Sequence, residues 1–428
     1  MEAGGESLDG IRSQVRSWLE EAWDPELTVR EWWARLADSG WGMPHWPEEW
    51  FGRSLSERAA GAVREELAAA GVLGPPGGAG PLMAAQVLLA QGSDEQRRRW
   101  LPLLARGEEN WCQFFSEPGA GSDLAALQCR AVLDGDEWVI NGQKVWNSGT
   151  LVADRGILLA RTDPDVPKHR GISFFVIPVD QPGVEIRPIR QMNYREEFNE
   201  TFFTDARVPA SDMVGGPGDG WRAAMTTLSN ERANFAGGGE HRLVTVDAGE
   251  KGGNLDRKVK DVLAEATAHP QMGGANTPPV HTVADLIGLA RRHGRAGDPL
   301  VRQRIAAIHA ASEALRWTAL RASAASAAGR QPGAESSVGY LGAVRVLRRV
   351  RDLAAEIAGP AATVMAPDAP DGGDVAMTIM TVPCHGIQGG SEQIQMNILG
   401  ERVLGLPKDP QVDRDVPFRQ LAVGTQCT

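Results

Sequence analysis

Residues 116–123 read SEPGAGSD, and residues 141–149, about one strand-turn-strand unit later, read NGQKVWNSG. Both segments combine hydroxyl side chains with glycines, which permit tight or left-handed backbone, and the second adds a large indole. Such residues suit a site that wraps a flat, hydrogen-bonding ligand. SEPGAGSD alone is also an ordinary surface turn, because Pro118, Gly119 and Asp123 are common turn residues. The two segments together predict a flavin site.

Strand-like alternation surrounds these two segments. It begins near Trp111 and continues through EWVINGQKVW, RGILLART, GISFFVIPV, VEIRPIR and NETFFTDARV, which are separated by turns rich in Asp, Gly and Pro. Helical periodicity precedes the strands from about residue 10 and returns after residue 221. We therefore expect a mainly α protein with a small antiparallel β domain between two helical ones: an N-terminal helical domain (1–111), a β domain (112–216) and a C-terminal helical bundle (217–428).

One helix has clear signals at both ends. Ser93, with Gln96 three residues later, forms a capping box before RRRWLPLLARG. Gly107 lies where a helix that ends after Arg106 needs a left-handed residue. These signals predict a helix between residues 93 and 107.

A glycine-rich, polar stretch at 244–282 interrupts the C-terminal helical region. It contains one weakly amphipathic piece, in which Leu255, Val259, Val262 and Ala266 share a face. A lid or partner-docking element is one interpretation. A tolerated surface insertion is the other.

Charge and cysteine content exclude several classes of protein. The 55 acidic and 44 basic side chains give a net charge of -11, so no overall positive field attracts nucleic acid or anionic lipid. The acidic, polar start is unlike a secretory signal, and no apolar run has the length of a membrane span, so we expect a cytoplasmic protein. Four scattered cysteines predict reduced thiols and no metal site.

The glycine-rich segment lacks both common nucleotide-binding patterns. Leu124 stands where a dinucleotide fingerprint needs its third glycine after Gly119 and Gly121. No Lys-Ser or Lys-Thr pair follows, as a Walker loop requires.

The segments FFSEPGAGSDL, NGQKVWNSG and GGSEQIQMNILGERVLGLP (389–407) resemble the acyl-CoA dehydrogenase family, and GSDEQRRRWLPLLARGE and FTDARVPASDMVG extend the resemblance over nearly the whole chain. The order of helical, β and helical regions matches as well. The resemblance implies an FAD-dependent enzyme that oxidises an acyl-CoA thioester and passes electrons to an electron-transfer flavoprotein. It also implies a homodimer or homotetramer whose cofactor sites span subunits.

The resemblance also implies which residues contact FAD. Within one subunit they are Gln113, Phe115, Ser116, Gly121, Ser122, Trp146, Asn147, Ser148, Ser391 and Gln393. Arg292 and Gln303 have the spacing of the family's contacts from a neighbouring subunit, although Arg295 and Ala296 replace the Phe-Gly pair expected between them. A core indole is the alternative for Trp146, and a solvated helix face is the alternative for the arginines.

The catalytic base has two possible places in the family. Gly389 occupies the place in the tail motif where many members carry Glu, and its backbone N–H can still polarise a thioester carbonyl. The other place holds Glu231, immediately before Arg232, and we expect Glu231 to be the base. A locally paired helix carboxylate is the alternative. We expect Glu392 to be a helix cap and the Cys384-His385 pair to serve packing.

Two other functions remain open on the sequence. One is a flavin monooxygenase or oxidase of the same fold, which needs no base at Glu231. The other is a non-catalytic subunit of a hetero-oligomeric dehydrogenase, which Gly389 and the altered region after Arg292 suggest. The acyl group stays open, as does a carrier-protein thioester in place of acyl-CoA.

Overall fold

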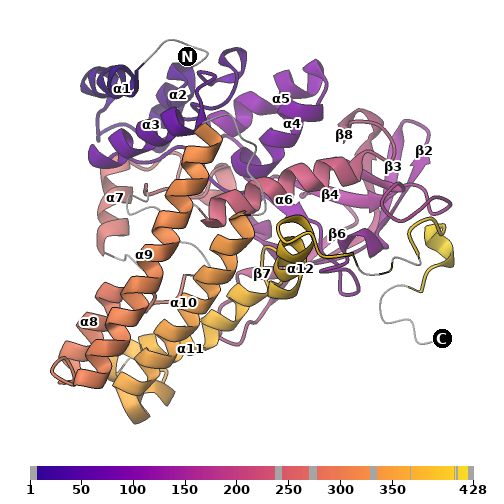
Figure 1. The fold of residues 1–428 in the computed structure, drawn as a ribbon. Coiled ribbons are helices and arrows are strands. Elements are labelled where there is room, and N and C mark those ends of the chain that lie inside the picture. The colour runs from indigo at the N-terminus through magenta and orange to yellow at the C-terminus, as the bar shows by residue number, and fades with distance from the viewer. Residues whose placement is uncertain are drawn as a thin grey trace.

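The computed structural model describes residues 7–236, 243–268, 277–327, 335–366, 368–408, 410 and 413–422. Helices of the N-terminal part, a central sheet and a C-terminal helical bundle follow one another along the chain (Figure 1). The prediction of a mainly α fold with a central β domain is confirmed. No helix in the described ranges combines the length and the apolar character that crossing a bilayer requires.

The N-terminal helices pack around tryptophans. They are α1 (Leu8–Ala22), α2 (Val29–Ser39), α3 (Glu57–Ala69), α4 (Ala85–Gln91) and α5 (Asp94–Ala105). On α1, Ile11, Val15 and Leu19 are buried at four-residue intervals, which places them on one face. This face joins a core that includes Trp32 of α2 and Val63 of α3.

The central sheet has the strand order β6-β7-β3-β2-β4-β5-β8, with β1 added beside β4. The strands are β1 (Trp111–Phe114), β2 (Arg130–Asp134), β3 (Glu137–Ser148), β4 (Arg155–Arg161), β5 (Ile172–Pro178), β6 (Val184–Ile189), β7 (Phe198–Pro209) and β8 (Met213–Val214). Most pairs are antiparallel, but β1 and β2 each pair with β4 in parallel. The expected antiparallel sheet is therefore only antiparallel-rich, since the long crossover from β1 to β4 permits a parallel pair.

Both faces of the sheet are buried at β4 and β5, because successive side chains of a strand point to opposite faces. Ile157, Leu159, Phe174 and Val176 join the core that contains Trp100 of α5 and Ala223 of α6 (Gly220–Ala236). Leu158, Ala160, Phe175 and Ile177 join a second core with residues of β3 and β7. One face of the sheet thus packs against helices of both helical parts, and the other face packs against strands of the sheet itself.

The predicted capping box is confirmed. Ser93 Oγ accepts from Gln96 N at 3.2 Å, and Gln96 Oε1 accepts from Ser93 N at 3.0 Å. Helix α5 ends at Ala105, and Gly107 has the expected left-handed backbone with φ +63°.

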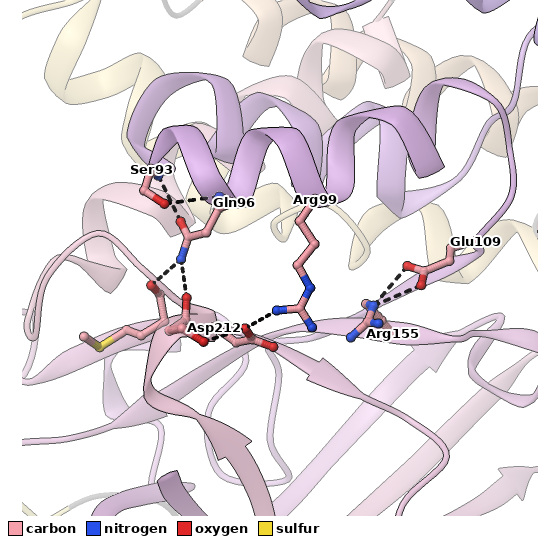
Figure 2. Close-up of polar contacts among 8 residues, drawn as sticks. Ser93, Gln96, Arg99, Glu109, Arg155 and Asp212 are labelled. Atoms are coloured by element: carbon pink, nitrogen blue, oxygen red, sulfur yellow. Dashed lines mark hydrogen bonds and ion pairs between the residues drawn. The ribbon is translucent and has the colours of Figure 1, made fainter. Parts of the chain in front are cut away.

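The same Gln96 side chain docks α5 onto the β domain (Figure 2). Its Nε2 donates to Ser211 O at 2.7 Å and to Met213 O at 2.8 Å. One turn further, the Arg99 guanidinium lies 2.7 Å from the buried Asp212 carboxylate. These contacts fix the N-terminal helices relative to the sheet.

Helix α10 (Glu335–Ala358) is the centre of the C-terminal bundle. It packs against α6, α9 (Pro299–Ala327), α8 (Val283–Arg292), α11 (Asp374–Thr381) and α12 (Glu392–Arg402). Its residues Val350, Leu353 and Ile357, spaced three and four apart, are buried against Leu286 and Leu289 of α8.

The segment 243–268 is built into the N-terminal core, which differs from both interpretations made for it. Leu255, Val259 and Val262, the last two on α7 (Val259–Ala268), are buried in the same core as α1 and α2. Arg30 N donates to Leu255 O, and Val259 N donates to Leu27 O, each at 2.9 Å. The hydrophobic face was recognisable in the sequence, but its partner lies more than 200 residues away. Residues 269–276 lie outside the described ranges.

Gln96→Glu tests the docking of α5. A carboxylate keeps the cap but faces two carbonyl oxygens, Ser211 O and Met213 O, without a proton to donate. We expect the free energy of unfolding to fall by about 1–3 kcal/mol, measured by urea titration. The control is Glu95→Gln at a neighbouring exposed position, where we expect a change within about 0.5 kcal/mol. If the two variants have the same free energy of unfolding, Gln96 does not dock α5 onto the β domain.

Candidate active site

The glycine-rich loop (residues 116–123) is a tight turn fastened to β3. Glu117 and Ala120 exchange backbone hydrogen bonds of 3.0 Å in both directions, which closes the turn over Pro118 and Gly119. Val145 N donates to Ser116 O at 2.9 Å. The segments SEPGAGSD and NGQKVWNSG are therefore in direct contact.

A buried ion pair between Lys144 of β3 and Glu117 of the loop holds this loop in place. Lys144 Nζ, on a side chain with no exposed surface, lies 2.8 Å from Glu117 Oε1 and donates to Phe115 O at 2.9 Å. The Glu117 carboxylate also accepts from Gln128 N at 2.6 Å and from Cys129 N at 2.9 Å. Because both charges are hydrogen-bonded on several sides, the pair fixes the loop without leaving an uncompensated charge.

Trp146 is the bulged residue of β3. The pairing of β3 with β7 shifts register between Val145 and Asn147, and Trp146 adopts φ +65°. Its side chain is 58% exposed and meets the Phe198 ring edge-on. Trp146 is therefore not a core indole. A positive φ at a non-glycine residue persists only where the surroundings impose it, and such positions cluster at functional sites.

Asn147 beside it points inward and is 2% exposed. Its side-chain Nδ2 donates to Gln113 O at 2.9 Å, and its backbone carbonyl oxygen accepts from Asn199 Nδ2 at 2.9 Å. Within the described structure, Asn147 Oδ1 and Asn199 Oδ1 are buried acceptors without a hydrogen-bond partner. Through its two hydrogen bonds, Asn147 joins β1, β3 and β7 beside Trp146.

The far end of the glycine-rich loop faces open space. A Cβ added to Gly121 would meet no atom within 4 Å, and Gly121 and Ser122 are exposed. Ser122 Oγ lies 3.5 Å from Ser391 Oγ, which also caps α12 by accepting from Ile394 N. Free backbone, hydroxyls and a helix N-terminus fit the pyrophosphate of a dinucleotide.

Three of the residues expected to contact FAD differ in their exposure to solvent. The Phe115 ring is 4% exposed and packs edge-on against Phe174, so its side chain belongs to the core. Ser148 is exposed at the end of β3, and Gln393 is exposed in the first turn of α12.

The tail before α12 turns through two glycines. Gly389 has φ +65° and Gly390 has φ +92°, and Gly389 O accepts from Gln395 Nε2 at 3.3 Å. Glu392 lies in the first turn of α12, but Ser391 supplies the cap, and Glu392 Oε1 lies 3.0 Å from Arg348 Nη1 of α10. The Glu392 carboxylate is thus committed to an ion pair.

Cys384 and His385 have structural partners. Burial raises the pKa of the Cys384 thiol to about 11, so it is protonated at neutral pH. His385 Nδ1 lies 3.1 Å from Gln388 Nε2. Cys112, Cys129 and Cys384 form no disulfide within the described ranges, and Cys427 lies outside them. The side chains that the structure describes hold no group of three or more His, Cys, Asp or Glu residues suited to a metal ion.

Glu231 belongs to α6, whose beginning packs against the sheet through Ala223 and Ala224. The side chains of Glu231 and Arg232 lie outside the part of the chain that the structure describes. The assignment of Glu231 as the base therefore stays a prediction.

Arg292 and Gln303 lie in the α8–α9 region, which Figure 1 shows at the opposite end of the C-terminal bundle from the sheet. Arg292 Nε donates to Asp371 Oδ1 at 2.5 Å, and its side chain is 57% exposed. Gln303 is exposed on α9. Arg295 Nη2 lies 2.6 Å from Asp298 Oδ2. Near this region, Glu356 of α10 pairs with Arg304 of α9.

Sequence reasoning missed the residues that support the site, namely Glu117, Lys144 and Asn199. A signal existed for the ion pair, because Lys144 is the one cation within the strand pattern VINGQKVW and Glu117 lies in the adjacent motif. Asn199 carried no comparable signal, since its role depends on the register between β3 and β7.

Lys144→Met tests the ion pair. The change leaves Glu117 buried without its cation, so we expect the free energy of unfolding to fall by about 3–5 kcal/mol. The double variant Lys144→Met/Glu117→Gln should recover part of that loss. The control Arg207→Met removes an exposed cation beside Glu137, where we expect about 0–1 kcal/mol. Chemical denaturation measures all three, and a loss at Lys144 no larger than at Arg207 would contradict the role of the pair.

Comparison with known proteins agrees with this architecture. Three family models match: the acyl-CoA dehydrogenase N-terminal domain over residues 8–108, the middle domain over 112–206 and the C-terminal domain over 278–404. The chain is 37% identical over 423 residues to acyl-CoA dehydrogenase IpdE1 of Mycobacterium tuberculosis, covering 94% of this chain and 99% of the relative.

Two solved structures share the fold over nearly the full length. The Tcur3481-Tcur3483 steroid ACAD has a TM-score of 0.69 at 26% identity, covering 96% of this chain and 99% of that one. The ChsE4-ChsE5 complex of Mycobacterium tuberculosis has a TM-score of 0.66 at 27% identity, covering 95% and 100%. The chain belongs to the acyl-CoA dehydrogenase family, whose members are FAD-dependent oxidoreductases.

Proposed function

We propose that this chain catalyses the α,β-dehydrogenation of an acyl-CoA thioester, with FAD bound between the glycine-rich loop and the bulge at Trp146. The observation that carries the proposal is the glycine-rich loop fastened to β3 directly beside an exposed Trp146 with strained backbone. Family membership gives the type of reaction, and this geometry supports the place where it occurs.

The residues that would hold FAD come from three segments. Trp146 flanks the flavin ring, Ser148 offers a hydroxyl near it, and Asn147 holds this part of β3 through its bond to Gln113 O. Gly121 and Ser122, with Ser391 opposite, present backbone and hydroxyl groups to the pyrophosphate. When bound, FAD supplies the acceptor for the hydride that leaves the β carbon.

Two residues act on the thioester. The Glu231 carboxylate accepts the proton from the carbon α to the carbonyl. The Gly389 N–H donates to the carbonyl oxygen, where negative charge develops as that proton leaves. The support for Glu231 is that Gly389 has no side chain and that Glu392, the nearest tail carboxylate, is held by Arg348.

A steroid-type acyl group is the substrate that the comparisons favour, because one similar structure is named a steroid ACAD. We further propose that an electron-transfer flavoprotein reoxidises the enzyme and that two copies assemble. Arg292 and Gln303 would then reach the partner's FAD. The α8–α9 region lies at the end of the bundle away from the sheet, which supports a contact of these residues with a partner subunit (Figure 1).

A second candidate is one chain of a two-chain enzyme. It is favoured by the name of the ChsE4-ChsE5 complex and by the altered segment at Arg295 and Ala296. Measuring the mass, FAD content and turnover of the isolated chain separates the two. One FAD per chain with turnover supports the homo-oligomeric enzyme, whereas FAD-free chains that gain activity only with a second protein support this candidate.

Glu231→Gln tests the base. The amide cannot take the α proton, so we expect FAD to stay bound while anaerobic flavin reduction by acyl-CoA slows by about 10²–10⁴-fold. Flavin absorbance in stopped flow measures both. Glu392→Gln is the control and should reduce its flavin at close to the wild-type rate. Fast reduction in Glu231→Gln would refute the assignment, and loss in Glu392→Gln alone would move the base to the tail.

A further inference from the structure

The C-terminal clamp, as we call residues 413–421, returns to the β domain beyond the region that the C-terminal family model matches (278–404). Figure 1 shows this yellow segment beside the sheet and away from the helical bundle. Phe418 N donates to Val166 O at 2.9 Å, and Arg419 N donates to Pro164 O at 3.0 Å. An isolated bridge between Pro167 and Pro417 adds to the contact. The clamp is thus paired with the loop between β4 and β5.

Beneath the clamp, Arg161 binds the chain that follows the glycine-rich loop. Its guanidinium donates to Ala125 O at 2.7 Å, to Leu127 O at 3.1 Å and to Lys168 O at 3.0 Å. The Phe418 ring covers it, with Arg161 Cζ 3.3 Å from the ring centroid. Burial lowers the pKa of Arg161 to about 10, so it remains charged at neutral pH.

A second link reaches the loop itself. Lys168 Nζ lies 2.8 Å from Asp123 Oδ2, at the last residue of SEPGAGSD, and 3.1 Å from Asp413 Oδ2 in the clamp. The Lys168 side chain is 16% exposed. One lysine therefore joins the two ends of this arrangement.

We propose that the C-terminal clamp is part of the cofactor site: Phe418 and Asp413 are positioning residues that hold residues 123–127, and with them Gly121 and Ser122, in the shape that binds the pyrophosphate. The ring shields the guanidinium from water, which would otherwise compete for its three hydrogen bonds. The inference rests on the proposed place of FAD, although the clamping of the loop does not depend on that assignment.

Phe418→Ala in the full chain tests the clamp with two readouts. The first is hydrogen exchange at the amides of Ala126 and Leu127, which donate to Asp123 O and Leu124 O, measured on protein without FAD. The second is the Kd of FAD for the same protein. We expect about tenfold faster exchange at these amides and a Kd raised about tenfold. Phe418→Trp keeps a ring over Arg161 and should behave as the wild type does.

A matched pair of charge variants tests the lysine link. Asp413→Asn removes one partner of Lys168, whereas Asp415→Asn removes an exposed charge two residues away. We expect Asp413→Asn to raise the Kd of FAD two- to fivefold at low salt and less at high salt, because the pair is partly exposed. Asp415→Asn should change neither readout.

The outcomes are distinct. Unchanged loop exchange and FAD affinity in both Phe418→Ala and Asp413→Asn would overturn the proposal. Uniformly faster exchange from α1 to α12 would also overturn it, because it would show that the variant is destabilised as a whole and not at the loop. If loop exchange rises while FAD affinity stays constant, the clamp is not part of the cofactor site. If the wild type binds no FAD, the proposed function fails, and the exchange data alone decide whether the clamp holds the loop.

Discussion

The buried pair of Lys144 and Glu117 is the constraint on which the candidate site depends. Lys144 has no exposed surface, and the Glu117 carboxylate of the glycine-rich loop balances its charge. The same carboxylate accepts from Gln128 and Cys129, so one side chain joins the start of the loop to β3 and to the chain just before β2. The loop keeps its shape through these contacts of the protein itself.

The bulge of β3 lies two residues after Lys144. Val145 is bonded to Ser116, Asn147 is bonded to Gln113 and Asn199, and the residue between them is left out of the pairing with β7. Trp146 accordingly takes a positive φ and turns its indole outward. The segments near residues 113–122, 145–148 and 389–391 are the ones that we propose to hold FAD.

Much of the fold could be predicted from the sequence because its signals are local. The capping box at Ser93, the glycine at 107 and the change from helical to strand periodicity near Trp111 each depend on neighbouring residues. The burial of Leu255 against the N-terminal helices could not be predicted, since an apolar face does not identify its partner. Gln96 illustrates both cases. Its capping bond with Ser93 is local and could be predicted, whereas its bond to Ser211, 115 residues away, could not.

In the candidate site, too, some features could be predicted from the sequence and others could not. The hydroxyls and glycines of SEPGAGSD were recognisable, whereas the exposure of Trp146 required the register of β3 with β7. Arg292 had the right spacing, yet its contact with Asp371 depends on a turn nearly 80 residues later. The sequence motifs identified candidate residues. The partner and the exposure of each side chain depend on tertiary contacts.

The most direct test of the central claim is an experimental structure of the purified chain with FAD bound. We expect a flavin ring that contacts Trp146, with the pyrophosphate at Gly121 and Ser122 and the Lys144–Glu117 pair intact. FAD bound away from Trp146 and from Gly121 and Ser122 would contradict the proposed site.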